Sequence, residues 1–272
     1  MHSNDLAQKA KQLRFDTIRM IHEAKDGHPG PALSIADIIA VLYFSEMRID
    51  PANPQWEDRD RLILSKGHAC PIVYAALSQK GYFGAPVDHF NLRGLGSIFQ
   101  GHPVMNKTPG IDMTSGSLGN GIAIGAGMAV AGKHLGKDYR VFVIVGDGEM
   151  QEGITWEGVN FAAAQKLDNL VVFVDRNNWQ SGGSVCDIIG ANNLPERFAA
   201  FKWDVQEIDG HDFTQIEDGI KKNRTVIGKP SVIVCNTVKG KGCDFMEDDN
   251  AWHKGVPSDE QFRQVCNAMG GE

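Results

Sequence analysis

Two short, strongly apolar segments in the middle of the chain constrain its fold most. Residues 141–145 read VFVIV, residues 170–174 read LVVFV, and the segment between them is long enough for one helix. Runs of this kind are typical of strands buried on both faces of a parallel sheet, and parallel neighbours need a crossover connection, usually helical. The pattern therefore predicts an α/β protein.

Other segments extend this pattern in both directions along the chain. Short apolar runs predict further strands at 61–65, 203–208 and 231–238. Because these strands alternate with helical segments, we expect a mostly parallel sheet covered by helices on both faces. At this length the whole chain, 1–272, is expected to form one domain.

Helix signals lie between and around these strands. Apolar residues recur at helical spacing over 6–21, and Ser34 is a favoured N-cap for a helix over 34–44. Asp212 is expected to cap another helix that contains Phe213, Ile216 and Ile220. Two further segments are expected to be helical: the region after the small-residue loop within 115–131, and the tail 259–269.

Composition excludes several classes of function. Of the 272 residues, 42% are hydrophobic and 22% are charged, with a formal net charge of −7 and no basic block, so nucleic acid is not expected as a partner. No apolar run is long enough for a membrane span or a secretory signal, and a cytoplasmic protein is expected. Five cysteines without CxxC spacing favour buried, reduced thiols.

Polar residues at the ends of predicted strands indicate a site. Asp147 follows the strand over 141–145, Asn177 follows the next strand, and His68 follows the strand over 61–65. Ligands of parallel sheets bind at the carboxyl ends of strands, so these residues are expected close together. One carboxylate and one amide oxygen suit Mg²⁺ that also binds phosphate oxygens, although an Asp-Gly turn and an Asn-rich loop are also common turn chemistry.

The GDG at 146–148, followed some thirty residues later by Asn177, resembles the signature of thiamine-diphosphate enzymes, and the wider sequence resembles transketolase. Nine motifs occur in the order of that family: GHPG at 27–30, SKGHA at 65–69, GHP at 101–103, TSGSLG at 114–119, GDG at 146–148, QEG at 151–153, DGHD at 209–212, KGKG at 239–242 and WHKGVP at 252–257. The resemblance covers only the N-terminal, diphosphate-binding half of a full-length transketolase.

This resemblance implies a thiamine-diphosphate-binding fold (PP module) and a set of cofactor ligands. The metal, Mg²⁺ or else Ca²⁺ or Mn²⁺, would be held by Asp147, Asn177 and the main-chain carbonyl of Trp179. Thiamine diphosphate would be bound by His68, Gly116, Ser117, Leu118, Gly146, Asp147, Gly148, Glu149, Asn177, Trp179 and His253.

Nine histidines are present, and the resemblance assigns chemistry to a few of them. His28 and His253 would transfer protons, and His102 would donate a hydrogen bond to the two-carbon fragment. His211 is interpreted as structural because it lies between Gly210 and the capping Asp212. Ordinary surface or core roles are expected for the remaining four: His2, His22, His89 and His134.

One role has no candidate in the chain. The family activates the cofactor with a glutamate on the pyrimidine ring, and that glutamate belongs to the missing half, so neither Glu149 nor Glu152 is expected to replace it. Glu152 and Glu157 match carboxylates near the interface between two active sites, but solvated helix acids are an equally good interpretation. The sequence also departs from the family pattern around Trp179 and at Ser117, where proline is common.

The leading hypothesis is the N-terminal, diphosphate-binding subunit of a split transketolase, which transfers a two-carbon ketol unit from a ketose to an aldose. The pyrimidine-binding and C-terminal domains are expected on a separate chain, in a heterotetramer with two copies of each chain. A specialised transketolase, for example for a sulfonated sugar rather than a sugar phosphate, remains open. So do the E1 subunit of a 2-oxoacid dehydrogenase, a deoxyxylulose-phosphate synthase fragment and a non-catalytic scaffold. A Rossmann domain is disfavoured because the glycines at 119–127 do not have GxGxxG spacing.

Overall fold

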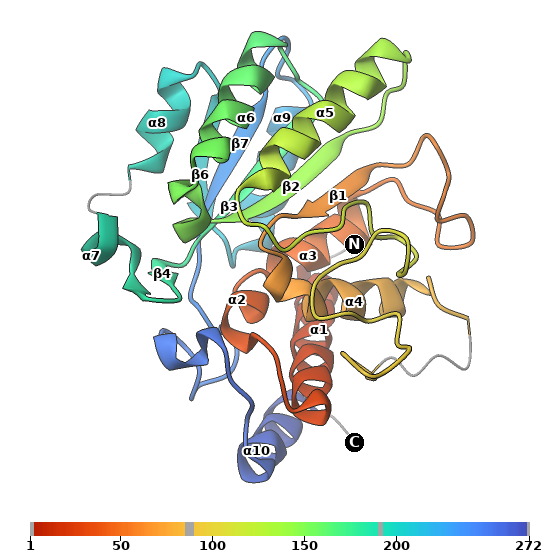
Figure 1. Ribbon diagram of the computed structural model, residues 1–272, viewed down its shortest axis with the longest axis vertical. Coiled ribbons are helices and arrows are strands. Elements are labelled where there is room, and N and C mark those ends of the chain that lie inside the picture. Colours follow the sequence, from red (N-terminus) through yellow and green to blue (C-terminus); the bar gives the residue numbers. More distant parts are fainter. Residues whose placement is uncertain (1–2, 85–89, 190–192, 271–272) are drawn as a thin grey trace.

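A five-stranded parallel sheet forms the centre of the protein (Figure 1). The computed structural model describes residues 3–84, 90–189 and 193–270. The strands follow the order β1-β2-β3-β7-β6, and every neighbouring pair is parallel. Their bounds are β1 Arg61–Leu64, β2 Val141–Gly146, β3 Leu170–Arg176, β6 Asp204–Asp209 and β7 Ser231–Asn236. All five predicted strands are therefore confirmed, with β3 at the centre of the sheet.

The continuous apolar runs arise because both faces of the sheet are buried. In β2, Phe142 and Ile144 pack into one hydrophobic cluster, whereas Val141, Val143 and Val145 pack into the other. Successive side chains of a strand point to opposite faces, so neither face of a doubly covered strand can be polar.

Helices cover both faces of the sheet, as predicted (Figure 1). The first cluster contains residues of α1 Ser3–Ala24, α3 Ala36–Val41, α4 Cys70–Lys80 and α9 Phe213–Asn223. The second contains residues of α5 Asn120–His134, α6 Gly153–Ala164 and α8 Leu194–Ala200. A smaller cluster joins α1 to α2 Pro29–Leu33 and α10 Asp259–Met269. The remaining elements are short: η1 Leu42–Glu46, η2 Gly67–Ala69, η3 Gly148–Gln151, β4 Trp179–Gln180, β5 Gly183–Ser184, α7 Val185–Ile189 and η4 Asn250–His253.

The helix predicted over 34–44 is wrong in its start and its cap. The chain becomes helical earlier, in α2, where Pro29 occupies the first position, and α3 begins only after Ile35. Ser34 has helical dihedral angles at the end of α2, which are not those of an N-cap, and its hydroxyl donates to the Asp175 carboxylate at 2.7 Å. By contrast, Asp212 caps α9 by accepting from the main-chain N–H groups of Thr214 and Gln215.

The prediction of buried thiols holds only in part. All five cysteines are free, and Cys70, Cys235 and Cys243 are buried, but Cys186 is exposed and Cys266 is half-buried. None of the helices in the described ranges combines the length and apolar character needed to cross a bilayer.

Candidate active site

A cavity of about 390 Å³ lies at the carboxyl ends of the central strands. Parallel strands end at the same edge of a sheet, which brings together segments that are far apart in the sequence. The turns after β1, β2 and β3 supply His68, Asp147 and Asn177, as predicted. The cavity also receives His28 from the start of α2 and His253 from η4.

Nearly all the residues predicted to form the site contact this cavity. The lining includes His28, His68, His102, Gly116, Leu118, Gly146, Asp147, Gly148, Glu149, Asn177, Trp179 and His253. Ser117 is exposed and is not one of the described residues that line it. The prediction about His2 and His89 lies outside the described residues.

Asp147 and Asn177 are tied together by main-chain contacts between β2 and β3. The Asp147 carboxylate accepts hydrogen bonds from the N–H groups of Gly148 (2.8 Å) and Asn178 (2.7 Å), and the Asp147 N–H donates to the Asp175 carbonyl (3.2 Å). The expected proximity of the two residues is therefore confirmed. Burial, with the Asp175 charge nearby, raises the pKa of Asp147 to about 7. A cation at this position would favour the ionised carboxylate.

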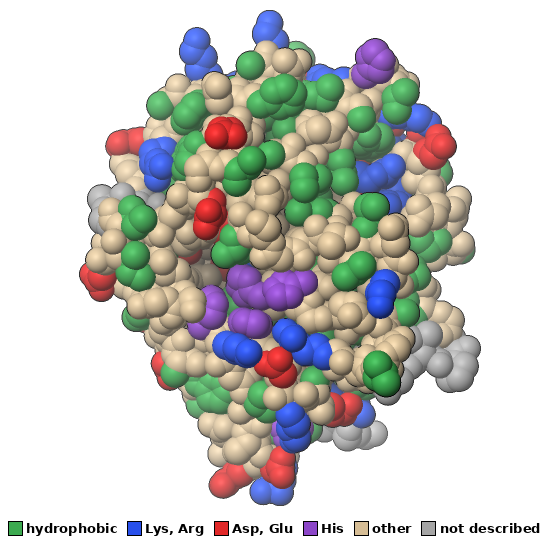
Figure 2. All heavy atoms as spheres, viewed as in Figure 1, with side chains coloured by type: hydrophobic (Ala, Val, Ile, Leu, Met, Phe, Trp, Pro, Cys, Tyr) green, Lys and Arg blue, Asp and Glu red, His purple; other side chains and the backbone are tan. Residues whose placement is uncertain are grey.

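Three histidine rings form a cluster in the cavity. Histidine side chains gather on this face of the molecule in Figure 2. The ring centroids of His28 and His68 are 5.1 Å apart, those of His68 and His253 are 5.3 Å apart, and those of His28 and His253 are 5.8 Å apart. Burial lowers the pKa of His28 and of His253 to about 4 and that of His68 to about 2, and nearby lysines add to the effect. The rings are therefore neutral at pH 7.

Lys239 fixes the tautomer of His253. The Lys239 ammonium lies 3.0 Å from His253 Nδ1 and donates to Asn250 Oδ1 at 2.7 Å. Because an ammonium group only donates, Nδ1 must accept and the ring proton must be on Nε2. His253 is thus prepared to donate a hydrogen bond from Nε2. Burial, with the Lys66 charge, lowers the pKa of Lys239 to about 8.

The Glu149 carboxylate is engaged by the protein itself. It accepts from the Ser65 hydroxyl and from the N–H groups of Gly119 (2.7 Å) and Gly146 (3.0 Å). These contacts join the end of β2 to the loop that precedes α5, so Glu149 holds the cavity wall in place. Glu152 also lines the cavity, whereas Glu157 is exposed on α6.

His211, interpreted as structural, has hydrogen-bond partners in the protein. His211 Nδ1 lies 2.7 Å from the Asp37 carboxylate, and its Nε2 accepts from the Val238 N–H at 2.9 Å. Asp37 also forms a buried ion pair with Arg14 at 2.6 Å. The structural interpretation of His211 is confirmed.

Sequence reasoning missed three polar residues of the site. Lys66 and Asp175 form a buried ion pair with N–O 2.6 Å, and Lys239 is fully buried. The signals were present in the sequence: Lys66 and Lys239 belong to two of the motifs, and Asp175 is an acidic residue within an otherwise apolar strand. A charged residue in such a strand needs a partner, because an unpaired buried charge is very costly.

The donor set at the strand ends fits a divalent metal that carries a diphosphate. In the part of the chain that the structure describes, no group of three His, Cys, Asp or Glu side chains could hold a metal alone. A carboxylate and an amide oxygen therefore leave several coordination positions for ligand oxygens and water, which suits Mg²⁺ chemistry. His28 lines this cavity, and its buried Nδ1 has no hydrogen-bond partner among the described residues.

Asp147 and Asn177 are called the metal clamp below. A parallel sheet with this metal clamp at its strand ends defines a class of protein, a domain that binds a diphosphate cofactor through a divalent metal. The family follows from sequence comparison, in which residues 5–272 match the model described as "Transketolase, thiamine diphosphate binding domain". The chain belongs to the transketolase family, and its cofactor is thiamine diphosphate with a divalent metal.

Similar proteins include both separate subunits and full-length enzymes. The chain is 42% identical to the 6-deoxy-6-sulfo-D-fructose transketolase subunit of Clostridium sp. (strain MSTE9), covering 95% of this chain and 94% of the relative. It is 37% identical to one subunit of the apulose-4-phosphate transketolase of Phocaeicola vulgatus, covering 99% of this chain and 95% of the relative. The crystal structure of transketolase from Campylobacter jejuni matches with a TM-score of 0.94 and 33% identity, over 99% of this chain and 43% of that one.

Proposed function

We propose that this chain is the diphosphate-binding subunit of a two-chain transketolase that moves a two-carbon ketol unit from a ketose to an aldose. The observation that carries the proposal is the convergence of Asp147 and Asn177 in a cavity that four histidines also line. The two relatives named as subunits are matched over almost their whole length, which supports a separate partner chain. Membership of the transketolase family favours this interpretation over a deoxyxylulose-phosphate synthase fragment or the E1 subunit of a 2-oxoacid dehydrogenase.

In this proposal the strand ends hold the metal and the diphosphate. Asp147, Asn177 and the Trp179 main-chain carbonyl bind Mg²⁺, for which Ca²⁺ or Mn²⁺ could substitute. His68 and the N–H of Gly148 contact the diphosphate, and Leu118 supports the apolar part of the cofactor. When bound, thiamine diphosphate supplies the electron sink that makes cleavage of the ketose carbon–carbon bond possible.

The histidines handle protons and orient the sugar. A neutral His28 can accept the hydroxyl proton whose loss releases the aldehyde, because its ring lines the cavity and burial lowers its pKa to about 4. His253 donates from Nε2, and His102 donates to the two-carbon fragment across the cleft. The negative diphosphate would raise the pKa of His28 toward neutrality and make it a better base.

We propose that the partner contributes the pyrimidine-binding domain with its glutamate and the C-terminal domain, in a heterotetramer of two copies of each chain. The surface of α5 and α6 supports such an assembly. Both helices carry apolar residues around their whole circumference, and Ile124, Ile154 and Phe161 are 38–45% exposed. Hydrophobic side chains, coloured green in Figure 2, gather in this region. Helices of this composition are normally covered.

We propose that the substrates are sugars with an anionic end, either a phosphate or a sulfonate. The names of the two subunit relatives include one group of each kind, which supports the class without choosing between its members. Free cysteines support a reducing, cytoplasmic location.

Reconstitution tests the function. The chain is co-expressed with the candidate partner chain, and the transfer of a two-carbon unit to an aldose is measured with thiamine diphosphate and Mg²⁺. We expect activity that neither chain has alone, with a loss of at least about a hundredfold in Asp147→Ala, because the metal clamp is removed. Full activity in the isolated chain would contradict the split site. Unchanged activity of the complex with Asp147→Ala would show that the subunit is only a scaffold.

A further inference from the structure

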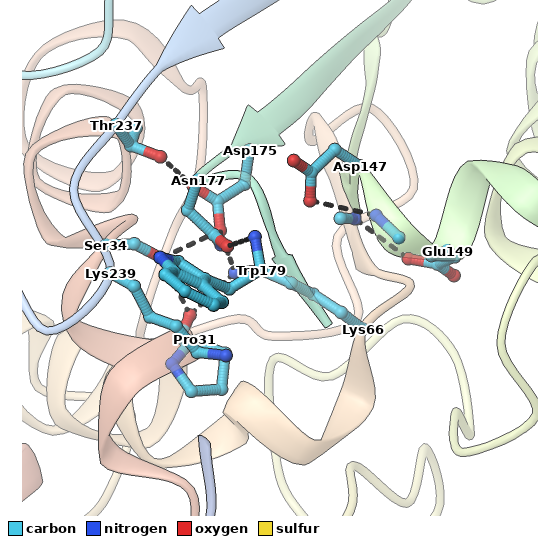
Figure 3. A network of polar contacts seen from close by, with 12 residues as sticks. Pro31, Ser34, Lys66, Asp147, Glu149, Asp175, Asn177, Trp179, Thr237 and Lys239 are labelled. Atoms are coloured by element: carbon cyan, nitrogen blue, oxygen red, sulfur yellow. Dashed lines mark hydrogen bonds and ion pairs between the residues drawn. The ribbon is translucent and has the colours of Figure 1, made fainter. Parts of the chain in front are cut away.

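Asp175, at the end of β3, accepts four hydrogen bonds beneath the metal clamp (Figure 3). Its Oδ2 accepts hydrogen bonds from the Lys66 ammonium at 2.6 Å, the Ser34 hydroxyl at 2.7 Å and the Asn177 amide nitrogen at 2.7 Å. Its Oδ1 receives the Thr237 hydroxyl. These partners come from α2–α3, the turn after β1 and the ends of β3 and β7, so one carboxylate joins four segments of the site.

The contact with Asn177 fixes which end of the side-chain amide faces the cavity. An ionised carboxylate only accepts hydrogen bonds, so the Asn177 NH₂ group must face Asp175 and its Oδ1 must point the other way. This Oδ1 accepts one hydrogen bond, from the Trp179 N–H at 3.1 Å. An amide oxygen has two lone pairs, and the second is available to a cation. An NH₂ group in that position would repel a cation.

The ionised carboxylate of Asp175 is stabilised by Lys66, which forms a buried ion pair with it. The two side chains are 0% and 2% exposed, and Lys66 also donates to the Pro31 carbonyl at 2.6 Å. Without Lys66, the ionised Asp175 would lie beside a second buried carboxylate, Asp147, whose main-chain N–H donates to the Asp175 carbonyl. A buried ion pair of this kind is weak evidence for a role in stability, because well-packed apolar residues often replace such pairs without loss.

We propose that Asp175, with Lys66 as its counter-ion, is a positioning residue that orients the Asn177 amide so that its oxygen faces the metal. The proposal rests on the function proposed above and adds two residues to the site, neither of which contacts the metal in this assignment. Residues that orient metal ligands commonly change metal affinity by ten- to a hundredfold when they are altered.

Two matched double variants separate orientation from charge. Lys66→Met/Asp175→Asn and Lys66→Met/Asp175→Leu both remove the ion pair, but only the first keeps an oxygen that can accept from Asn177. In the first variant the new amide nitrogen faces Thr237, whose hydroxyl can accept as well as donate. Any direct effect of Lys66 on the ligand is the same in both variants. Circular dichroism and thermal unfolding establish that both chains are folded.

The probe is Mn²⁺ with inorganic pyrophosphate, added to the full chain and followed by calorimetry and by the electron paramagnetic resonance of bound Mn²⁺. We expect the Leu variant to bind at least about tenfold more weakly than the Asn variant. Asn177→Ala is then added to each. If Asp175 acts through Asn177, this change weakens binding in the Asn background and has little effect in the Leu background, since effects on one coupled unit are not additive.

Each outcome supports or overturns the inference. Equal affinities of the two folded double variants would overturn it, as would an equal effect of Asn177→Ala in both backgrounds. A merely structural role for Asp175 would change the melting temperature but would not produce this dependence on Asn177. If the wild-type chain fails to bind Mn²⁺ with pyrophosphate, the metal clamp is wrong, and the proposed function falls together with this inference.

Discussion

Gly30 in α2 is the point at which the segment that follows His28 packs against the segment that carries His253. A Cβ atom placed on Gly30 would lie 2.7 Å from the Trp252 carbonyl oxygen and 3.1 Å from Cγ of Lys239. The first contact is with main chain, so it cannot be relieved by a side-chain rotation. Gly30→Ala must therefore move η4 away from α2.

The expected cost follows from two opposing effects. Forcing a methyl group into a packed contact costs about 1–3 kcal/mol, whereas replacing a helical glycine by alanine contributes about 0.5–1 kcal/mol of stability. The net loss should be about 1–2 kcal/mol, which corresponds to a decrease in melting temperature of about 2–4 °C for a domain of this size. Movement of η4 should also weaken binding of Mn²⁺–pyrophosphate, because η4 carries His253.

Gly127→Ala is the matched control. Gly127 lies within α5, and a Cβ atom there would meet nothing within 4 Å in the described structure. The same chemical change should therefore raise stability by about 0.5–1 kcal/mol. Both variants are measured by urea and thermal unfolding with circular dichroism. If Gly30→Ala stabilises the protein as Gly127→Ala does, the tight contact between α2 and η4 does not exist as described.

Three further outcomes are expected. The histidines of the cleft have pKa values of about 2 to 4, below the ordinary 6.5, so their side chains bind more protons in the unfolded chain between about pH 4 and 6.5. Stability should therefore fall as pH decreases from 7 to 5. A urea midpoint that stays constant over this range would contradict the burial of the rings. Asp37→Ala leaves the buried Arg14 guanidinium without its ion-pair partner and should cost about 3–5 kcal/mol in urea unfolding, and a loss under about 1 kcal/mol would refute this. Phe161→Ser should change stability by less than about 0.5 kcal/mol but weaken assembly with the partner, as measured by analytical ultracentrifugation; unchanged assembly would show that the partner lies elsewhere.

The strands and the two candidate metal ligands at their ends could be predicted because both follow from local sequence. A run such as VFVIV can be buried on both faces only in a doubly covered sheet, and the topology then places Asp147 beside Asn177. The histidines of the site could be predicted from the motifs. The resemblance to the family implied that they lie together, which their spacing in the sequence alone does not indicate. His28, His68 and His253 do share one cavity.

The network beneath the clamp could not be predicted, because its contacts are distant in sequence. Asp175 lies 141 positions from Ser34 and 109 from Lys66, and no periodicity links them. Ser34 looked like a helix cap because a serine before an apolar run is a favoured one, yet the chain is already helical at Ser34, at the end of α2. The position of Ser117 outside the cavity was missed for a related reason: a loop is not periodic, so its sequence does not tell which residues face inward.

The position of β3 between β2 and β7 has a consequence for how the site moves. Its main chain is hydrogen-bonded on both sides, so the amides next to Asp175 can exchange with solvent deuterium only when the centre of the sheet separates. Exchange at these amides should therefore be nearly as slow as global unfolding allows. Local opening of this part of the sheet therefore gives a cofactor no route into the cavity, and entry from the solvent side of the cleft is expected.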